Sequence, residues 1–474
     1  MTASENKGSV HAIDTCFTMK SFHLFCWLLL LLAMSACSLL PERRTDDAGA
    51  DIPQQWREHA AEQSVAVSWV ETFQDATLKQ LVDRALEKNY ELKAAAARIQ
   101  AAAAQARIDG SPRWPQIFFS ADYEEVQIRE AGFGSARFNV FEALFGVSWE
   151  ADLWGRIRDS HLAAITEATA VQADFQATRL SLAARVAQSY FELIEAELQS
   201  AIIEQSIKDR GVIADLVRGR FQRGLVRGLD LRLALNDLAN ARAQLKQARN
   251  RVQQISKRLE ILLGNYPEDK VWSITQLPSL PVAIPAGLPS ELLERRPDLV
   301  AAFKRLQAAD LRTVSAQKLR LPRITLTATG GSRSVDLTEL IDPRAAAWNI
   351  FAGLVQPVFT GWRIQGEIFR NQARAEEALN QYKNTALNAF REVEQALAAE
   401  EWLRQQEIAL RKAVEHTGSS QKLAIYSYRN GTIEILTLLD SYRSMLNAQT
   451  AHLSVTRQLL SNRINLYLAL GGNA

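Results

Sequence analysis

Apolar and polar residues alternate with a period of two in short segments of both halves of the chain. In residues 141–153 every second side chain is apolar: Phe141, Ala143, Phe145, Val147, Trp149, Ala151 and Leu153. The same pattern occurs at Ile117–Tyr123 and again at Ile324–Ala328, whereas residues 345–360 are diluted by Gly and Ala. Such alternation predicts strands with one apolar and one polar face. It suits either a membrane barrel with a wet lumen or a soluble sheet with one buried face.

Helical periodicity dominates the rest of the chain. Residues 156–223 contain no proline, and a helix of that length would extend on the order of 100 Å. Residues 231–262 carry apolar side chains at steps of three or four, and a second stripe recurs every seven residues at Leu439, Leu446, Leu453, Leu460 and Tyr467. Helices with two adjacent apolar stripes pack against neighbours on two sides. The pattern therefore favours a closed ring of long helices, each pair preceded by an Ala-rich helical stretch (76–111 and 290–320).

The second half of the chain repeats the first at an offset of 207 residues. Residues 221–224 align with 428–431, and Leu263 and Gly264 align with Leu470 and Gly471. The register slips by one residue only once, where 145–155 aligns with 351–361. The chain is therefore interpreted as a tandem duplication. We expect repeat 1 at 76–276 and repeat 2 at 291–474, each with a helix, two strands and two long helices, joined by a Pro-rich linker at 277–290.

The number of predicted strands bears on the oligomeric state. Two strands per repeat give four per chain, whereas a closed barrel needs about eight or more. Lipid tolerates no open sheet edge. If these strands enter a membrane, several chains must share one barrel, and three chains would provide twelve strands and twelve long helices.

The N-terminal region contains the one long uncharged apolar run, residues 22–40. It is interpreted either as a membrane anchor or as a secretory signal, and the basic Lys20 with small Ser35 and Ala36 before Cys37 favours a lipoprotein signal. We expect translation to start at Met19, cleavage of residues 1–36, lipidation of Cys37, and a lipidated arm over 37–75. Of the three cysteines only Cys37 would remain in the mature chain, which excludes a disulfide framework.

Composition and motif content narrow the function classes. Lys and Arg number 55 against 53 Asp and Glu, without a basic stripe, so no nucleic-acid partner is expected. A mean hydropathy of −0.14 argues against a bundle of membrane helices. The six histidines form no metal-binding spacing, and no phosphate-binding loop, Cys pair or Ser–His–Asp candidate is found. We therefore expect no enzyme, no cofactor and no metal site, and we interpret His452 as a packed or interfacial residue.

Several segments together resemble a known family. They are WVETFQDATLKQLVDRALEKNYEL, VSWEADLWGRIR, RFQRGLVRGLDL, LLERRPDLVAA, QKLRLPRITL and YRNGTIEILTLLD. Across almost the whole mature chain they resemble the TolC-like outer-membrane efflux proteins, in the lipoprotein (NodT) branch of the RND-type outer-membrane factors. The resemblance implies an α+β fold. It also implies a homotrimer whose twelve-stranded β-barrel crosses the outer membrane and is continued by an α-helical barrel in the periplasm.

The resemblance also implies candidate site residues at the ends of the helical hairpins. Leu436 would plug the channel, Asp440 would form an acidic ring, and Arg443 would tie the tip helices together. Tyr428 and Asp230 would form a latch, and Gly224 and Gly431 would make the tip turns. Ile433 departs from the pattern, because some members carry a basic residue there. Three copies of Asp440 around an axis would repel anions and attract cations. The alternative is that Asp440 and Arg443 form an ordinary i,i+3 surface pair.

The function implied is that of a passive channel in a tripartite efflux system. A periplasmic adaptor (membrane fusion protein) and an inner-membrane pump, of the proton-driven RND type, would deliver drugs or other small toxic compounds through an iris-like gate. The protein would lie in the Gram-negative outer membrane, in contact with its lipid. Two alternatives stay open: a protein-secretion (type I) channel on the same scaffold, and a non-conducting periplasmic coiled-coil lipoprotein. The period-2 segments at 117–123 and 141–153 argue against the latter.

Overall fold

The computed structural model describes residues 43–49, 56, 69–130, 134–268, 276–281 and 289–472. They fall into two compact units. The first contains residues 43–47, 109–163 and 309–376, and the second contains the remaining described residues. Both units therefore combine segments of both repeats. The predicted signal segment 1–36, Cys37, most of the arm 37–75 and part of the linker 277–290 lie outside the described residues.

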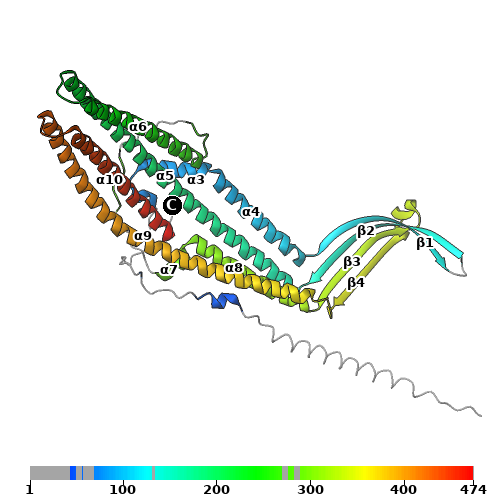
Figure 1. Cartoon of the computed structure of the whole chain (residues 1–474). Coiled ribbons are helices and arrows are strands. Elements are labelled where there is room, and N and C mark those ends of the chain that lie inside the picture. The colour runs from blue at the N-terminus through cyan, green and yellow to red at the C-terminus, as the bar shows by residue number, and fades with distance from the viewer. Residues whose placement is uncertain are drawn as a thin grey trace, which may run out of the picture. The chain divides into compact units, whose positions relative to one another are not determined.

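The first unit contains a four-stranded antiparallel sheet (Figure 1). Its strands are β1 (Gln116–Glu130), β2 (Gly134–Ala151), β3 (Arg323–Ser334) and β4 (Ala346–Val355), in the spatial order β1-β2-β3-β4. Short 3-10 turns precede the two hairpins at η2 (Ser111–Arg113) and η3 (Lys318–Arg320), and η4 (Leu337–Ile341) and η5 (Pro343–Ala345) connect β3 to β4. β1 and β4 are the edges of this sheet. Each has a strand partner on one side only among the described residues.

The two faces of the sheet differ in polarity, as the alternation predicted. On one face the register aligns Phe119, Phe145, Gly330 and Trp348 across the four strands, and Ile117, Val147, Ala328 and Ile350 beside them. The rings of Phe119 and Phe145 are 5.1 Å apart. The opposite face is largely polar, with Gln116, Ser120, Asp122, Glu142, Ser148, Glu150, Thr325, Thr327, Thr329 and Asn349. The apolar side chains of the first face are largely solvent-exposed in the single chain, so this face needs another apolar environment.

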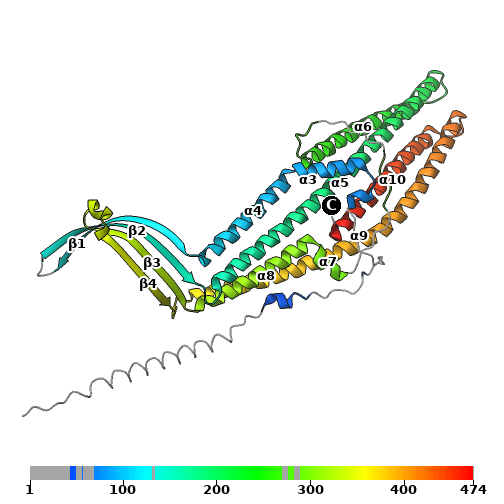
Figure 2. The same ribbon diagram turned by 180° about the vertical axis from the view of Figure 1, so that it is seen from behind.

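Four long helices form two hairpins. The first pairs α5 (Arg156–Gln222) with α6 (Gly228–Leu262), and the second pairs α9 (Arg363–Arg429) with α10 (Ile435–Ala469), as Figures 1 and 2 show from opposite sides. α5 and α9 both have 67 residues, and α6 and α10 both have 35. The predicted helix over 156–223 and the predicted duplication are thereby confirmed. Within the described part of the chain, no helix combines the length and the apolar character needed to cross a membrane.

Each Ala-rich stretch is divided into two helices rather than one. α3 (Ala76–Lys88) and α4 (Tyr90–Gly110) meet at Asn89, and α7 (Pro289–Arg295) and α8 (Pro297–Gln317) meet at Arg296, 207 residues later. The Asn89 Oδ1 accepts the backbone N–H groups of Glu91 and Leu92, so it caps the new helix. Pro297 has no N–H to continue α7 and is tolerated only in a first turn.

The two breaks are held by equivalent contacts. The Asn89 Nδ2 donates to the carbonyl of Leu262 at 2.9 Å, and the Arg296 Nη1 donates to the carbonyl of Ala469 at 3.3 Å. Leu262 and Ala469 are the last residues of α6 and α10. Each break is thus fastened to the end of the last long helix of its own repeat, and the hydrogen bond satisfies a helix-terminal carbonyl.

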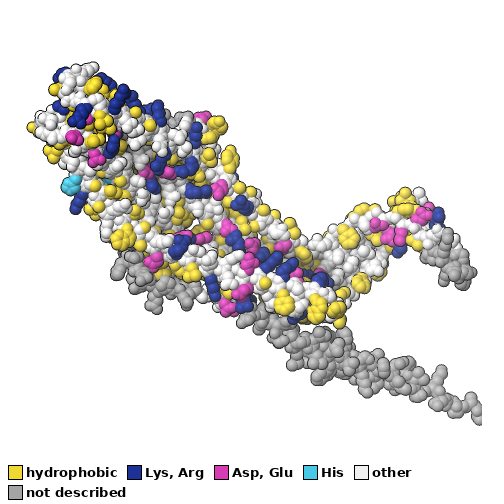
Figure 3. All heavy atoms as spheres, in the orientation of Figure 1, with side chains coloured by type: hydrophobic (Ala, Val, Ile, Leu, Met, Phe, Trp, Pro, Cys, Tyr) yellow, Lys and Arg dark blue, Asp and Glu magenta, His cyan; other side chains and the backbone are white. Residues whose placement is uncertain are grey.

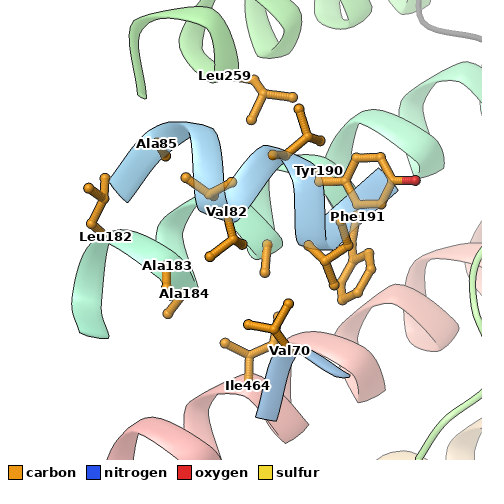
Figure 4. Close-up of a cluster of buried hydrophobic side chains, with 14 of the residues drawn as sticks. Val70, Val82, Ala85, Leu182, Ala183, Ala184, Tyr190, Phe191, Leu259 and Ile464 are labelled. Atoms are coloured by element: carbon orange, nitrogen blue, oxygen red, sulfur yellow. The ribbon is translucent and has the colours of Figure 1, made fainter. Parts of the chain in front are cut away.

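A hydrophobic core joins the ends of α6 and α10 to α3, the middle of α5 and α2 (Trp69–Thr72). Figure 4 shows Val82 and Ala85 of α3 beside Leu182–Ala184 of α5 and Leu259 of α6. Trp69, Leu78, Phe191, Leu193 and Ile194 are fully buried in the same cluster. A second cluster around Leu299, Phe390 and Leu466 packs α7, α8, α9 and α10. Trp56 belongs to it, since its ring lies 6.2 Å from Phe390.

Glycines follow the ends of α6 and α10 at equivalent positions. Gly264 and Gly471 have φ values of +73° and +69°. A Cβ on Gly264 would lie 2.7 Å from the carbonyl oxygen of Lys88, and one on Gly471 would lie 3.0 Å from that of Arg295. Both the left-handed backbone and the close approach therefore require glycine.

Gly264→Ala should lower the thermal unfolding temperature of the full-length protein, because the added methyl group meets the Lys88 carbonyl and the backbone conformation becomes strained. The expected cost is about 1–3 kcal/mol. Gly211→Ala is the matched control, since Gly211 lies inside α5 with open space around its Cβ position. It should leave stability unchanged or raise it by up to about 1 kcal/mol. Circular dichroism at 222 nm measures both; equal unfolding temperatures would contradict the role assigned to Gly264.

Candidate functional site

The candidate site lies at the free ends of the two helical hairpins. Gly224 and Gly431 occupy the turns with φ values of +71° and +76°, a conformation that favours glycine. The backbone N–H of Leu225 donates to the carbonyl oxygen of Arg220 at 2.9 Å, and the backbone N–H of Thr432 donates to the carbonyl oxygen of Ser427 at 3.0 Å. The two tip turns are therefore built in the same way, 207 residues apart, at the glycines that the sequence predicted as tip turns.

The four helices pack together within one chain just behind these turns. The buried cluster contains side chains from α5, α6, α9 and α10: Ile213, Ala214, Val217, Ala234, Leu238, Tyr428, Ile435, Leu438, Leu439 and Tyr442. The second-repeat member Leu439 belongs to the stripe expected every seven residues from Leu439 to Tyr467. The cluster gives the polar contacts between the two hairpins an apolar base.

A buried carboxylate joins three helices at this end. Asp237 of α6 has only 2% of its surface exposed. Its Oδ2 accepts a hydrogen bond from the Nη1 of Arg210 on α5 at 2.8 Å. Its Oδ1 accepts one from the Nε of Arg443 on α10 at 3.1 Å, and the Nη2 of Arg443 lies 3.0 Å away. Arg443 thus connects the second hairpin to the first.

The two arginines differ in their surroundings. Arg210 is buried, whereas about half of the Arg443 side chain is exposed. Burial lowers the pKa of Arg210; Asp237 raises it and the neighbouring Arg443 lowers it. The guanidinium stays protonated nevertheless, since arginine does not lose its proton in proteins. Arg210 is therefore the buried partner of Asp237, and Arg443 is its half-exposed partner.

Asp440 and Arg443 do not form an ion pair with each other in the structure. Asp440 is exposed, and within the described residues it forms no ion pair. Arg443 bonds to Asp237 instead, so the i,i+3 surface pair considered above is not formed. Leu436, one turn before Asp440, is 54% exposed. Leu436 and Asp440 are therefore free to face a neighbouring copy or a channel axis.

Tyr428 and Asp230, the expected latch, do not bond to each other. The Asp230 Oδ2 accepts the backbone N–H of Arg227 at 3.1 Å and caps α6. Tyr428 is 3% exposed, and its hydroxyl finds no hydrogen-bond partner in the described part of the chain. Burial raises the pKa of Tyr428, an effect that nearby Arg220 opposes and Asp230 reinforces. The two side chains influence each other electrostatically, but they form no hydrogen bond here.

Arg220 makes a second link between the hairpins. Its Nη1 and Nη2 donate to the carbonyls of Tyr428 and Arg429 at 3.0 and 2.7 Å. Its guanidinium lies 5.0 Å from the centre of the Tyr428 ring, a cation–π contact. Lys and Arg side chains gather at the hairpin ends (Figure 3), among them Arg218, Arg220, Arg223 and Arg227 at the end of the α5–α6 hairpin. Sequence reasoning did not single out Arg220, Arg210 or Asp237.

The described residues show no arrangement suited to a metal ion, since no group of three or more His, Cys, Asp or Glu side chains converges among them. The Nε2 of His452 lies 2.9 Å from the Oε1 of Glu407, which places this histidine between α10 and α9. This contact agrees with its interpretation as a packed residue.

Comparisons with known proteins bear on both the fold and the role of this site. The family described as outer membrane efflux protein matches the chain twice, at residues 81–265 and 288–472. Both ends of the second match lie 207 residues beyond those of the first (288 − 81 and 472 − 265). The outer membrane protein OprJ of Pseudomonas aeruginosa is 32% identical over 458 residues, covering 94% of this chain and 95% of OprJ.

Two further similarities extend over nearly the whole chain. The pyoverdine export outer membrane protein OpmQ of Pseudomonas putida is 30% identical over 466 residues, covering 94% of this chain and 97% of OpmQ. The solved structure of the outer-membrane channel OprN has a TM-score of 0.83 at 27% identity and covers 91% of this chain and 98% of that one. These similarities confirm the predicted α+β fold class, the outer-membrane location and the efflux role. The chain belongs to the outer membrane efflux protein family.

Proposed function

We propose that three copies of this chain form a passive channel through the outer membrane, closed at the hairpin ends by a gate. The observation that carries the proposal is the four-stranded sheet of the first unit. Its apolar face is exposed, and β1 and β4 each leave one edge without a strand partner among the described residues. Four strands are too few to close a barrel, and an open edge in lipid leaves backbone N–H and C=O groups unsatisfied.

Pairing β4 of one copy with β1 of the next removes every open edge and gives a barrel of twelve strands. The apolar face then meets lipid, and the face with Ser120, Asp122, Thr327 and Thr329 lines the lumen. The long hairpins of the three copies build the helical barrel. The protein itself catalyses no reaction, and the energy for transport comes from the inner membrane.

Its partners are a periplasmic adaptor and an inner-membrane pump of the RND type, and its cargo is drugs or other small toxic compounds. The similar protein OpmQ is named for the export of pyoverdine, a small compound rather than a protein. That relative favours efflux over protein secretion for this chain.

Full-length protein extracted in mild detergent should migrate as a trimer that converts to a monomer on heating, because edge pairing buries backbone groups that lipid cannot satisfy. Inserted into planar bilayers, it should conduct ions in discrete steps. Multi-angle light scattering and single-channel recording measure the two properties. A monomer without conductance would refute the channel.

For the gate, we infer that Arg443 is the releasable tie and Asp440 the selectivity element. Arg443 joins the α9–α10 hairpin to Asp237 of the α5–α6 hairpin at 3.0 Å. Asp440 and Leu436 are exposed, so in a trimer they are available to ring the axis, Leu436 as the plug. The buried Tyr428 hydroxyl still has a hydrogen to donate, which supports Tyr428 and Asp230 as a latch formed between moving parts.

Arg443→Ala should raise the conductance of reconstituted channels, because loss of up to about 1 kcal/mol in each of three chains shifts the closed–open balance of the trimer by up to about a hundredfold. Arg249→Ala is the matched control: it removes an exposed ion pair to Glu204 within one hairpin, at 2.6 Å, and should leave conductance unchanged. Asp440→Asn should instead reduce the preference for K⁺ over Cl⁻. Single-channel currents and reversal potentials separate the two effects. If Arg443→Ala and Arg249→Ala behave alike, the Arg443 tie does not hold the gate.

Cys37, which lies outside the described residues, is proposed as the lipid attachment site on the sequence pattern that precedes it. Cys37→Ala should abolish incorporation of radiolabelled palmitate and slow removal of residues 1–36, because the thiol that carries the lipid is lost. Cys26→Ala changes a cysteine within the cleaved segment and should leave labelling unaffected. Equal labelling of both variants would exclude Cys37 as the acceptor.

A further inference from the structure

Two phenylalanines interrupt the polar face of the sheet. Phe118 is the third residue of β1, and Phe351 is the sixth of the ten residues of β4. The register aligns Phe118 with Gly146, Thr329 and Asn349 across the four strands. Phe351 is aligned with Thr327, Ser148 and Gln116 in the neighbouring row on the same face. Phe118 is 47% exposed and Phe351 is 60% exposed. Both therefore present aromatic surface to solvent among hydroxyl and amide side chains.

Glycines allow both rings to lie along the sheet. A Cβ on Gly146, directly opposite on β2, would overlap the ring of Phe118. A Cβ on Gly353, two residues along β4 on the same face, would lie 2.7 Å from the ring of Phe351. The rings occupy the space that a side chain would otherwise fill. Both rings therefore lie along the polar face of the sheet and expose a flat aromatic surface on that face.

The same face carries acidic groups without a paired cation. Glu142 pairs with Arg333 at 2.8 Å, and Glu150 pairs with Arg156 at 2.8 Å. Asp122 and Glu124 are exposed and form no ion pair within the described residues. They lie four and six residues beyond Phe118 on the same face of β1, with Ser120 between, so Asp122 is about 13 Å along the strand from Phe118 and Glu124 is about 7 Å further. An aromatic surface is thus followed along the strand by uncompensated negative charge.

We propose that this strip, formed by Phe118, Phe351, Asp122 and Glu124, binds planar aromatic cations during their passage. The proposal rests on the proposed function, in which this face lines the lumen. Phe118 and Phe351 lie on the two edge strands, so each seam between copies joins a strand that carries one ring to a strand that carries the other, and the trimer carries six rings. A flat cationic compound stacks on the rings through its π-surface and cation–π attraction, while the carboxylates attract its charge.

The chemistry of the strip argues against other occupants. A metal ion requires several converging oxygen, nitrogen or sulfur ligands, whereas phenylalanine supplies none. An anion would be repelled by Asp122 and Glu124. A lipid chain would require a continuous apolar surface, but Phe118 and Phe351 are flanked by Ser120, Asn349, Thr327 and Ser148.

The test uses the full-length protein in lipid nanodiscs, with ethidium as a planar aromatic cation and fluorescein as a planar aromatic anion. Binding is measured by fluorescence anisotropy. Phe118→Leu and Phe351→Leu keep an apolar side chain but remove the aromatic face, and each should weaken ethidium binding about two- to tenfold. Phe119→Leu, one residue along β1 on the opposite face, is the matched control and should have no effect. Wild-type protein should bind fluorescein more weakly than ethidium.

Ethidium binding by a carboxylate variant and the K⁺ current distinguish a failure of the aromatic strip from a failure of the channel. Asp122→Asn with Glu124→Gln should weaken ethidium binding and also reduce the K⁺ preference of the current, whereas the phenylalanine variants should leave the K⁺ current unchanged. Equal ethidium binding by wild type, Phe118→Leu and Phe351→Leu, with normal K⁺ conductance, would overturn the aromatic strip while leaving the channel intact. Absence of K⁺ conductance in the wild type would instead refute the proposed channel.

Discussion

The organisation of this protein depends on one constraint: backbone groups at the edge of a sheet have no hydrogen-bond partner in lipid. The apolar face of the sheet is exposed, which suits lipid, yet β1 and β4 leave edges open and four strands are too few to close. Both features are compatible with a membrane only if copies pair edge to edge. Closing the barrel encloses the polar face and arranges the long helices of the copies around a common axis. Each residue near that axis is then present once per copy.

The duplication shows which contacts serve the scaffold and which serve the joining of the hairpins. Scaffold contacts occur twice, as in the bonds from Asn89 to Leu262 and from Arg296 to Ala469. The two ties between the hairpin ends, at Asp237 and at Arg220, each occur once. The positions 207 residues after Arg210 and Asp237 hold Thr417 and Ser444. The repeats therefore differ where this tie is made, with Arg210 and Asp237 in the first repeat and Arg443 in the second.

The sequence predicted most of the fold because its patterns are local. Period-2 alternation identified β1, β2 and β3, whereas the region of β4 was diluted by Gly and Ala, and the absence of proline identified the 67-residue helix α5. The breaks at Asn89 and Arg296 were missed although each has a local signal, the helix-capping side chain of Asn89 and the proline at position 297. The contacts that hold the breaks were not predictable, because each joins a helix end 173 residues away. The role of Asp237 was missed for the same reason. Its partner Arg443 lies 206 residues away, and only its place beside Leu238 in an apolar stripe hinted at burial.

The arrangement around Asp237 suits a tie that breaks and reforms. A buried carboxylate left without a partner destabilises a protein by about 3–5 kcal/mol, so a single ion pair between the hairpins would be difficult to open. Arg210, from the same hairpin as Asp237, remains bonded at 2.8 Å when Arg443 leaves. Release of the exposed Arg443 then costs only what an exposed ion pair contributes, about 1 kcal/mol or less. Over three copies the sum is about 3 kcal/mol, which is within the differential binding energy that a docking partner supplies to shift a two-state equilibrium.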